Sequence, residues 1–170
     1  KSQTVTELIK TTISVRNDSI IEKSYSDLNF ARKLLYDSGA INVDNTQSIK
    51  VGNFYLPVLY AGTHRLSLDS KVVNDIYKST DTTDATETAE TTASIFLLNK
   101  NKLIRISTNR IDNQKLEGTY DSNDSDIYKK IINNQEYLGS NSYKSDSYLS
   151  RIKPLLDKNK KVIGAIGVGN

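Results

Sequence analysis

The 170-residue chain has 23 Lys and Arg residues against 20 Asp and Glu, a formal net charge of +3 at pH 7. Because basic and acidic residues are interspersed, the composition argues against a nucleic-acid surface, where clustered basic residues with interleaved aromatics are expected. The absence of cysteine excludes a disulfide, a thiolate nucleophile and a cysteine-ligated metal within these residues. No run of about 18 apolar residues is present, so no membrane span and no signal peptide are predicted here.

Apolar residues recur at helical spacing from Gln3 to about Tyr36, which predicts one long helix that stops at Gly39. Its second part, Ser24 to Leu35, is expected to lie along a sheet, and its first two turns to project as a rod. A chain that begins within a helix and ends on a strand is expected to be a fragment of a longer protein. Residues 40–53 are polar and are interpreted as a turn-rich connection.

A strand with an edge character at Pro57 is predicted from Phe54 to Gly62, followed by a short helix from Leu66 to Tyr77. The stretch Ser79 to Thr92 consists almost wholly of Ser, Thr, Asp, Glu and Ala. It is interpreted as an insertion, either a flexible loop or a short capped helix.

The second half of the chain, from Ser94 to Gly169, is predicted to be rich in strands, with loops at 110–125 and one short helix at Asp126 to Asn134. The strands are expected at Ser94–Leu98, Lys102–Thr108, Tyr137–Tyr143, Ser147–Lys153 and Val162–Val168. Asn99 to Asn101 is a natural hairpin turn. Hairpin-linked strands with few helices predict an α+β fold with a five- to six-stranded antiparallel sheet.

Short segments in this order and spacing resemble a known family over roughly residues 50–170. They are Leu56–Val58, Ala61–Gly62, Ala93–Leu98, Leu103–Asn109, Gly118–Tyr120, Ile127–Tyr128, Tyr137–Gly139, Tyr148, Lys153–Leu155, Asp157, Val162–Gly164 and Val168–Gly169. Together they resemble the single Cache domain of bacterial chemoreceptors and sensor kinases. The sequence departs from the family in the turn Asp157 to Lys160, which lacks the usual Gly, at Arg151 and Ile152, and in the long Ser79–Thr92 stretch.

The resemblance implies a PAS-like domain exposed outside the cytoplasmic membrane. Residues 1–39 would be an N-terminal signalling helix and residues 40–170 the ligand-binding part of one structural domain. The resemblance also implies that transmembrane helices flank the domain and that the full-length protein is a homodimeric receptor, most often a chemoreceptor. The implied ligand is a small carboxylate or an amino acid. No cofactor and no metal are expected, and Arg151 is a position that is expected to alter ligand preference.

Strand alternation predicts which residues face that ligand. In the strand from Ile104, Arg105 and Ser107 should share one face, and Ile104, Ile106 and Thr108 the other. If the isoleucines pack on the long helix, the Arg105 guanidinium points to the opposite side, where it can bind a carboxylate with two parallel hydrogen bonds. The alternative is a surface arginine paired with an acidic residue across the sheet.

Ten tyrosines against three phenylalanines offer flat walls with hydroxyl groups for a ligand. Tyr60, Tyr137 and Tyr148 are predicted to border the pocket, together with Thr63, and core packing remains the alternative for each. Tyr120, Tyr128 and Tyr143 are expected on its lid. The one histidine, His64, is interpreted as a surface loop residue.

Catalysis finds little support, since a single histidine and no G-x-S-x-G motif leave no recognisable triad. Asp121, Asn123 and Ser125 imitate the start of a calcium loop, but the required Gly and terminal Glu are missing. Asp124 is expected to cap the following helix. The rival to a sensor is a ligand-free structural domain of the same fold that dimerises or binds a partner protein, which an exposed apolar stripe on residues 1–20 would favour.

Overall fold

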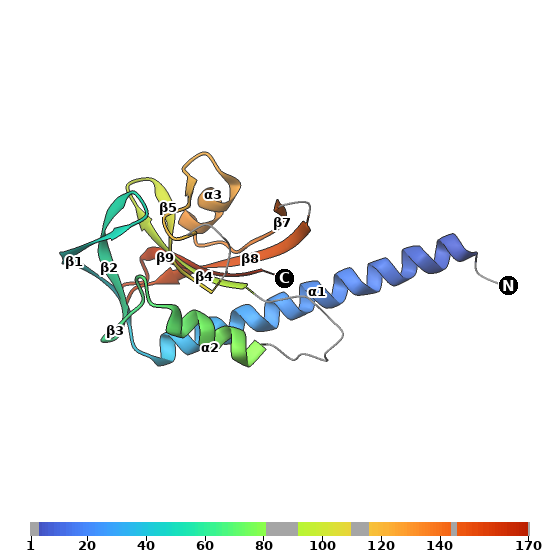
Figure 1. Ribbon diagram of the computed structural model, residues 1–170, viewed down its shortest axis with the longest axis horizontal. Helices are drawn as coiled ribbons and strands as arrows, with labels where there is room; N and C mark the ends of the chain where they lie inside the picture. The colour runs from blue at the N-terminus through green and yellow to red at the C-terminus, as the bar shows by residue number, and fades with distance from the viewer. Residues whose placement is uncertain (1–3, 81–91, 110–115, 144–145, 170) are drawn as a thin grey trace.

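The computed structural model describes residues 4–80, 92–109, 116–143 and 146–169. Helix α1 (Val5–Asp37) spans 33 residues, about 50 Å of helix, and its N-terminal half projects away from the rest of the molecule (Figure 1). Its first turn is closed by a capping box, in which the Thr4 hydroxyl accepts from the Glu7 amide and the Glu7 carboxylate from the Thr4 amide. The predicted long helix with a projecting rod is thus confirmed.

Behind α1 comes a three-stranded antiparallel sheet in the order β1-β2-β3, with β1 at Ile41–Val51, β2 at Phe54–Ala61 and β3 at His64–Arg65. The prediction of a turn-rich connection at 40–53 is wrong, because nearly all of it is strand β1. Its central residues are polar and mostly exposed, so no apolar alternation marks it in the sequence.

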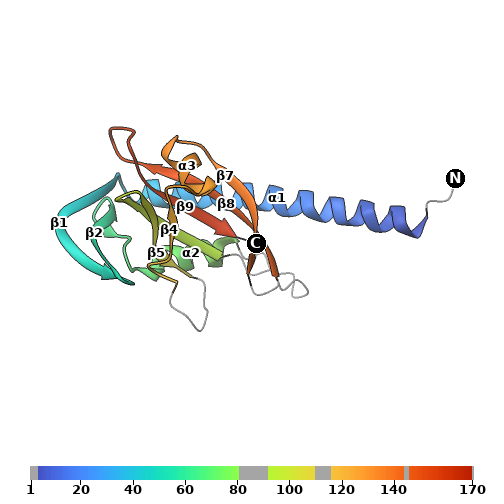
Figure 2. The ribbon, with the colours of Figure 1, turned by 90° about the horizontal axis from the view of Figure 1, so that it is seen from above.

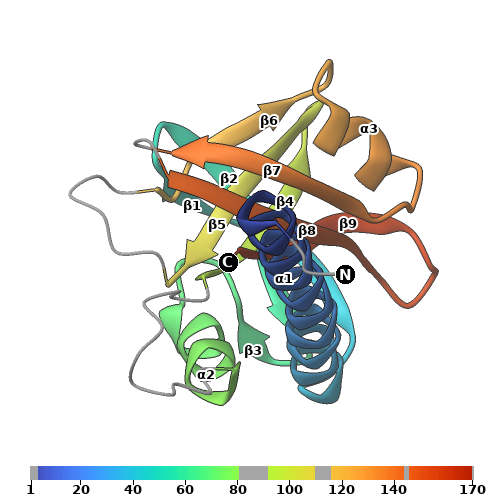
Figure 3. The ribbon, with the colours of Figure 1, turned by 90° about the vertical axis from the view of Figure 1, so that its right-hand side faces the viewer.

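The main sheet is antiparallel and has six strands in the order β6-β5-β4-β9-β8-β7. The strands are β4 (Thr92–Asn99), β5 (Lys102–Thr108), β6 (Tyr120–Ser122), β7 (Tyr137–Tyr143), β8 (Asp146–Leu156) and β9 (Val162–Gly169). Helix α2 (Ser70–Thr80) lies with α1 on one face, and α3 (Asp126–Ile132) covers the other (Figure 3). The predicted α+β class is confirmed.

Two hydrophobic clusters lie on opposite faces of this sheet. The larger one joins Leu28 and Leu35 of α1 to Ile95, Ile104 and Ile166, all at most 1% exposed, and it also includes α2. The smaller one surrounds α3 and contains Phe96, Leu103, Tyr128, Ile131, Ile152 and Ala165. We call the first side the α1 face and the second the Arg105 face.

The strand and helix positions in the second half agree with prediction to within a few residues, with two exceptions. Residues 120–122, predicted as loop, form the edge strand β6. Helix α3 is capped by Ser125, whose hydroxyl accepts from the Tyr128 amide, rather than by Asp124. The expected hairpin turn is present, with φ of 46° at Lys100 and 63° at Asn101, and most of the Ser79–Thr92 insertion lies outside the described residues.

Two glycines let the three-stranded sheet approach the end of α1 closely. The turn after α1 crosses the turn between β2 and β3 so closely that a Cβ on Gly39 would lie 2.5 Å from the Gly62 Cα, and one on Gly62 equally near the Ser38 carbonyl oxygen. Both glycines also have positive φ, 130° and 60°. This crossing fixes where the three-stranded sheet begins after α1, and Figure 2 shows that sheet beyond one end of the main sheet.

Candidate functional site

A β-bulge in β5 decides which residues occupy the Arg105 face. Ile95 pairs with Ser107 but the next residue of β4, Phe96, pairs with Arg105, so Ile106 is an extra residue without a partner on β4. Beyond the bulge the alternation is inverted. Thr108 therefore joins the face of Arg105, and Ser107 moves to the α1 face.

The predicted sharing of one face by Arg105 and Ser107 is thus wrong. The Ser107 side chain is 1% exposed, and its hydroxyl donates to the Asp69 carbonyl oxygen just before α2. Ser107 fixes the start of α2 against the sheet, on the side away from Arg105.

Arg105 is held by hydroxyl groups from three segments of the chain. Its Nε donates to the Ser94 Oγ at 3.1 Å, and its terminal NH1 donates to the Thr119 Oγ1. The Ser94 hydroxyl donates in turn to Thr108 Oγ1 at 2.9 Å, and Thr108 to the Ala93 carbonyl oxygen at 3.1 Å. Because each hydroxyl polarises the next, this chain of donors orients the half-buried guanidinium.

An aromatic ring forms the apolar side of the surroundings of Arg105. The guanidinium carbon of Arg105 lies 5.0 Å from the centroid of the Phe96 ring, a cation–π contact. Phe96 is 3% exposed, and it needs Gly167 opposite, since a Cβ there would come within 3.1 Å of Ile152 and 3.4 Å of the Phe96 ring. The small residue on β9 therefore makes room for the ring on which Arg105 rests.

A carboxyl group lies near the guanidinium. Asp121 on β6 pairs with Leu103, whose side chain belongs to the Arg105 face. Burial raises the pKa of the Asp121 carboxyl, and the positive charge of Arg105 opposes that shift. The site thus holds one cation and one carboxyl of raised pKa within electrostatic reach of each other, beside a row of hydroxyls.

Two of the tyrosines lie on this face, where both pack in the hydrophobic cluster around α3. Tyr128 on α3 is 7% exposed, and the partly buried Tyr137 at the start of β7 packs against the same cluster. Tyr120 does not cover the site, because its ring packs edge-on against Phe54 of β2, 5.5 Å between centroids. Sequence reasoning missed Ser94, Thr108 and Thr119. The bulge places Thr108 on this face and long-range pairing places Thr119, and the sequence signals neither.

The remaining predicted residues lie elsewhere. The Tyr60 hydroxyl accepts from Gln47 at 3.0 Å on the three-stranded sheet, and Thr63 is exposed in the turn that follows. Tyr148 on β8 pairs with Asn141 on β7. The structure does not describe the side chains of Tyr148 and Tyr143. His64 is in β3 and its Nε2 lies 3.3 Å from an Asp69 carboxylate oxygen.

Arg151 lies on the opposite face and belongs to the contact between α1 and β8. Its Nε donates to the Ser24 hydroxyl at 3.0 Å, its NH1 to the Glu136 carboxylate at 3.0 Å, and its NH2 to the Ile21 carbonyl oxygen. It is 7% exposed. The expectation that Arg151 shapes ligand preference therefore loses its geometric basis, because this side chain holds the helix instead.

The whole chain, residues 1–170, matches the family model of the Cache 3/Cache 2 fusion domain. The chain belongs to this Cache family. No curated protein matches the sequence. Cache domains are extracytoplasmic ligand-sensing modules of membrane proteins, so the predicted family and its PAS-like fold are confirmed.

Cache domains bind small-molecule ligands in sensor proteins. Within residues 4–80, 92–109, 116–143 and 146–169, no helix is long and apolar enough to span a membrane. In the same ranges no group of three or more His, Cys, Asp and Glu side chains is arranged to bind a metal ion.

Proposed function

We propose that this Cache domain senses a small molecule carrying a carboxylate, and that the Arg105 face binds it. The observation that carries the proposal is Arg105 itself, a half-buried guanidinium oriented by Ser94 and Thr119 and resting on Phe96. A guanidinium forms paired hydrogen bonds with a carboxylate, and partial burial strengthens them. The ligand would displace or share the hydroxyl contacts, which are weaker than those to a charged group.

Among carboxylates, the neighbouring Asp121 favours an amino acid. An α-ammonium group beside a carboxyl of raised pKa would lower that pKa and gain a charged partner, while the α-carboxylate faces Arg105. A dicarboxylate would instead place a second negative charge near Asp121. The aromatic and aliphatic side chains around α3, including Tyr128 and Tyr137, would accommodate an apolar ligand side chain.

The signal in this proposal passes from the Arg105 face to α1. Strands β4 and β9 carry residues of both clusters. A ligand that shifts Phe96 would therefore also shift the backbone that carries Ile95 and Ile166 on the α1 face. A ligand changes the position of α1 only by the difference in its affinity for the two arrangements. In our proposal the full-length protein is a homodimeric chemoreceptor. The displacement of α1 would then be transmitted to the membrane.

A thermal-shift screen against amino acids and organic acids tests the proposal. A saturating ligand raises stability by RT ln(1 + [L]/Kd), so a hit appears as a higher Tm that grows with concentration. Hits should be confirmed with Asp121→Asn, which we expect to weaken amino acids about tenfold and to leave simple monocarboxylates nearly unchanged. Equal loss for both classes would contradict the role of Asp121 but not that of Arg105.

The rival function is a ligand-free domain that dimerises or binds a partner. An exposed apolar stripe on residues 1–20 would favour this rival, and of the apolar side chains described there Val5 is 73% exposed and Ile20 is half-buried. Flat melting curves across the whole panel, together with a concentration-dependent dimer in sedimentation, would favour it over sensing.

A further inference from the structure

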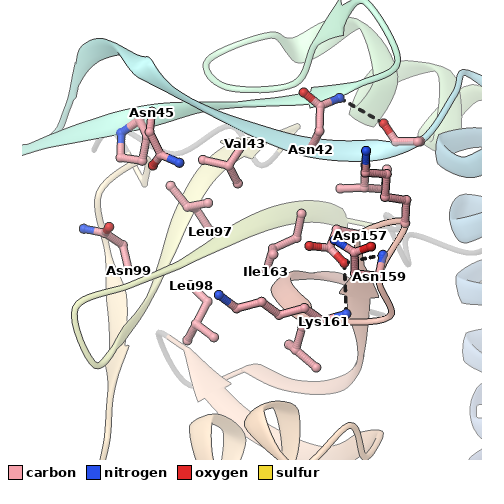
Figure 4. A pocket seen from close by; sticks show the side chains of 15 residues that line it. Asn42, Val43, Asn45, Leu97, Leu98, Asn99, Asp157, Asn159, Lys161 and Ile163 are labelled. Atoms are coloured by element: carbon pink, nitrogen blue, oxygen red, sulfur yellow. Dashed lines mark hydrogen bonds between the residues drawn. The ribbon is translucent and has the colours of Figure 1, made fainter.

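A cavity of about 740 Å³ lies between β1 and the turn-bearing ends of β4 and β9 (Figure 4). Its lining comes from both sheets, which are joined here by a bridge between Ile41 and Asp157, and it includes Leu98 and Val162 from the border of the smaller cluster. Cavities of roughly 300–1,000 Å³ are the usual size for small-molecule sites.

The floor of the cavity is apolar and its rim is polar. Val43 from β1, Leu97 from β4 and Ile163 from β9 lie at its centre in Figure 4 and are packed against the larger core. Around them stand Asn45, Asn99 and Lys161, all three lining residues. An apolar floor with a few polar groups at the rim selects an amphiphilic molecule rather than a fully hydrated ion.

The rim has an excess of positive charge. Lys158 and Lys161 are exposed and make no ion pair within the part of the chain that the structure describes. The one lining carboxylate, Asp157, accepts from the Asn159 amide at 2.8 Å and the Lys161 amide at 3.0 Å, so the turn partly offsets its charge. Figure 4 shows the Lys161 side chain running from this turn toward Leu98, along the cavity.

We propose that this cavity is a second binding site of the domain, for a monoanion with an aliphatic body such as a short-chain carboxylate. Its chain lies over Val43, Leu97 and Ile163, and its carboxylate is bound by Lys161, with Lys158 adding to the local potential. The side-chain amides of Asn45 and Asn99 complete the polar rim. Because β1 is joined to the end of α1 through Gly39, occupancy here bears on α1, the helix that packs on the opposite face of the main sheet from Arg105.

Sodium hexanoate titrated into ¹⁵N-labelled protein tests the proposal by chemical-shift mapping. We expect shifts at Val43, Leu97 and Ile163 that saturate at millimolar concentration, and an affinity that rises from butyrate to octanoate because each methylene buries more apolar area. Lys158→Gln/Lys161→Gln should weaken hexanoate about fivefold or more, since both cations are lost. The matched control Lys129→Gln/Lys130→Gln, exposed lysines of α3, should leave it unchanged.

The Arg105→Ala variant distinguishes the cavity from the site on the Arg105 face. The proposal requires that hexanoate still shifts the resonances of the cavity residues in this variant. Shifts confined to Ser94 and Thr119, or equal affinity for hexanol and hexanoate, would overturn the proposal. So would an unchanged affinity in the double lysine variant, or no saturable shift at the cavity. Since all four lysines are exposed, the variants are expected to fold, which the dispersion of the same spectra verifies.

Discussion

Two arginines on opposite faces of one sheet show how differently the same side chain is used. Arg151 on the α1 face is 7% exposed and is satisfied by a carboxylate, a hydroxyl and a helix carbonyl oxygen. Arg105 on the other face is half-buried, and its described hydrogen bonds go to the neutral hydroxyls of Ser94 and Thr119. The Arg151 guanidinium, paired with the Glu136 carboxylate, holds α1 on the sheet, whereas the Arg105 guanidinium is oriented by hydroxyls on the face where we propose that the ligand binds.

Further polar contacts beyond those of Arg151 join β8 to α1. The Lys153 ammonium donates to the Asn29 amide oxygen at 3.2 Å, and the Leu156 amide to the Tyr36 hydroxyl at 3.1 Å. Strand β8 is therefore joined to α1 by polar contacts at three successive levels. The α1 face is built to hold a helix in one place, and any displacement of α1 must break or rearrange these contacts.

The largest effect is expected from Arg151→Met. The substitution removes the partner of Glu136 and leaves the buried Ser24 hydroxyl with one bond fewer, which costs about 3 kcal/mol of unfolding free energy. Urea denaturation followed by circular dichroism measures it. An equal loss of stability in Arg105→Ala would contradict the distinction between the two arginines.

A smaller effect is expected from Gly167→Ala on the Arg105 face. The added Cβ crowds Ile152 and Phe96, so stability should fall by about 1 kcal/mol and the Phe96 ring should shift beneath Arg105. Gly167→Ala should therefore bind the ligand several-fold more weakly. The folded fraction of Arg151→Met should bind it with wild-type affinity. Unfolding curves and calorimetric titration of both variants check the pair of outcomes.

The acid–base behaviour of Asp121 gives a smaller effect still. Because burial raises its folded-state pKa above the unfolded value, the folded state holds the proton more tightly, and this contribution to stability declines as pH rises from about 4 through the raised pKa. Asp121→Asn removes that decline. The stability of the variant relative to wild type should thus increase with pH across this window, as urea midpoints at several pH values would show. A constant difference would mean that Asp121 has an ordinary pKa.

The smallest effect is expected from the exposed ion pair of Lys33 and Asp37. Their side chains are 73% and 62% exposed, and pairs of this kind contribute about 0–0.5 kcal/mol. Lys33→Ala should leave the urea midpoint nearly unchanged, which makes it a surface reference for Arg151→Met. A loss above about 1 kcal/mol would show that the C-terminal end of α1 is less solvated than its geometry indicates.

Most of the main sheet was predictable because its strands alternate regularly between hairpin turns, as at Asn99 to Asn101. Two features escaped prediction for physical reasons. Strand β1 is polar on most positions, so its pairing with β2, not its own burial, makes it a strand. The bulge at Ile106 leaves no mark in composition, since Ile, Ser and Thr all fit a regular strand, yet it exchanges Ser107 for Thr108 beside Arg105.

Of the candidate site, the sequence indicated Arg105 and Tyr137 but not what orients them. Thr119 reaches Arg105 only because the chain before β6 runs along β5, with the Arg105 amide donating to the Thr119 carbonyl oxygen at 2.9 Å. Tyr60 was predicted from strand position alone, and it lies on a separate sheet. Long-range pairing, which a single sequence does not specify, accounts for both results.

Isothermal titration of the best ligand from the screen into Arg105→Ala tests the central claim most directly. The matched control is Arg65→Ala, an exposed arginine of β3 that lies away from the Arg105 face. We predict that Arg105→Ala weakens binding at least about tenfold, as expected for losing a paired charge-assisted contact, while Arg65→Ala stays within about twofold of wild type. An Arg105→Ala affinity within about twofold of wild type would contradict the account.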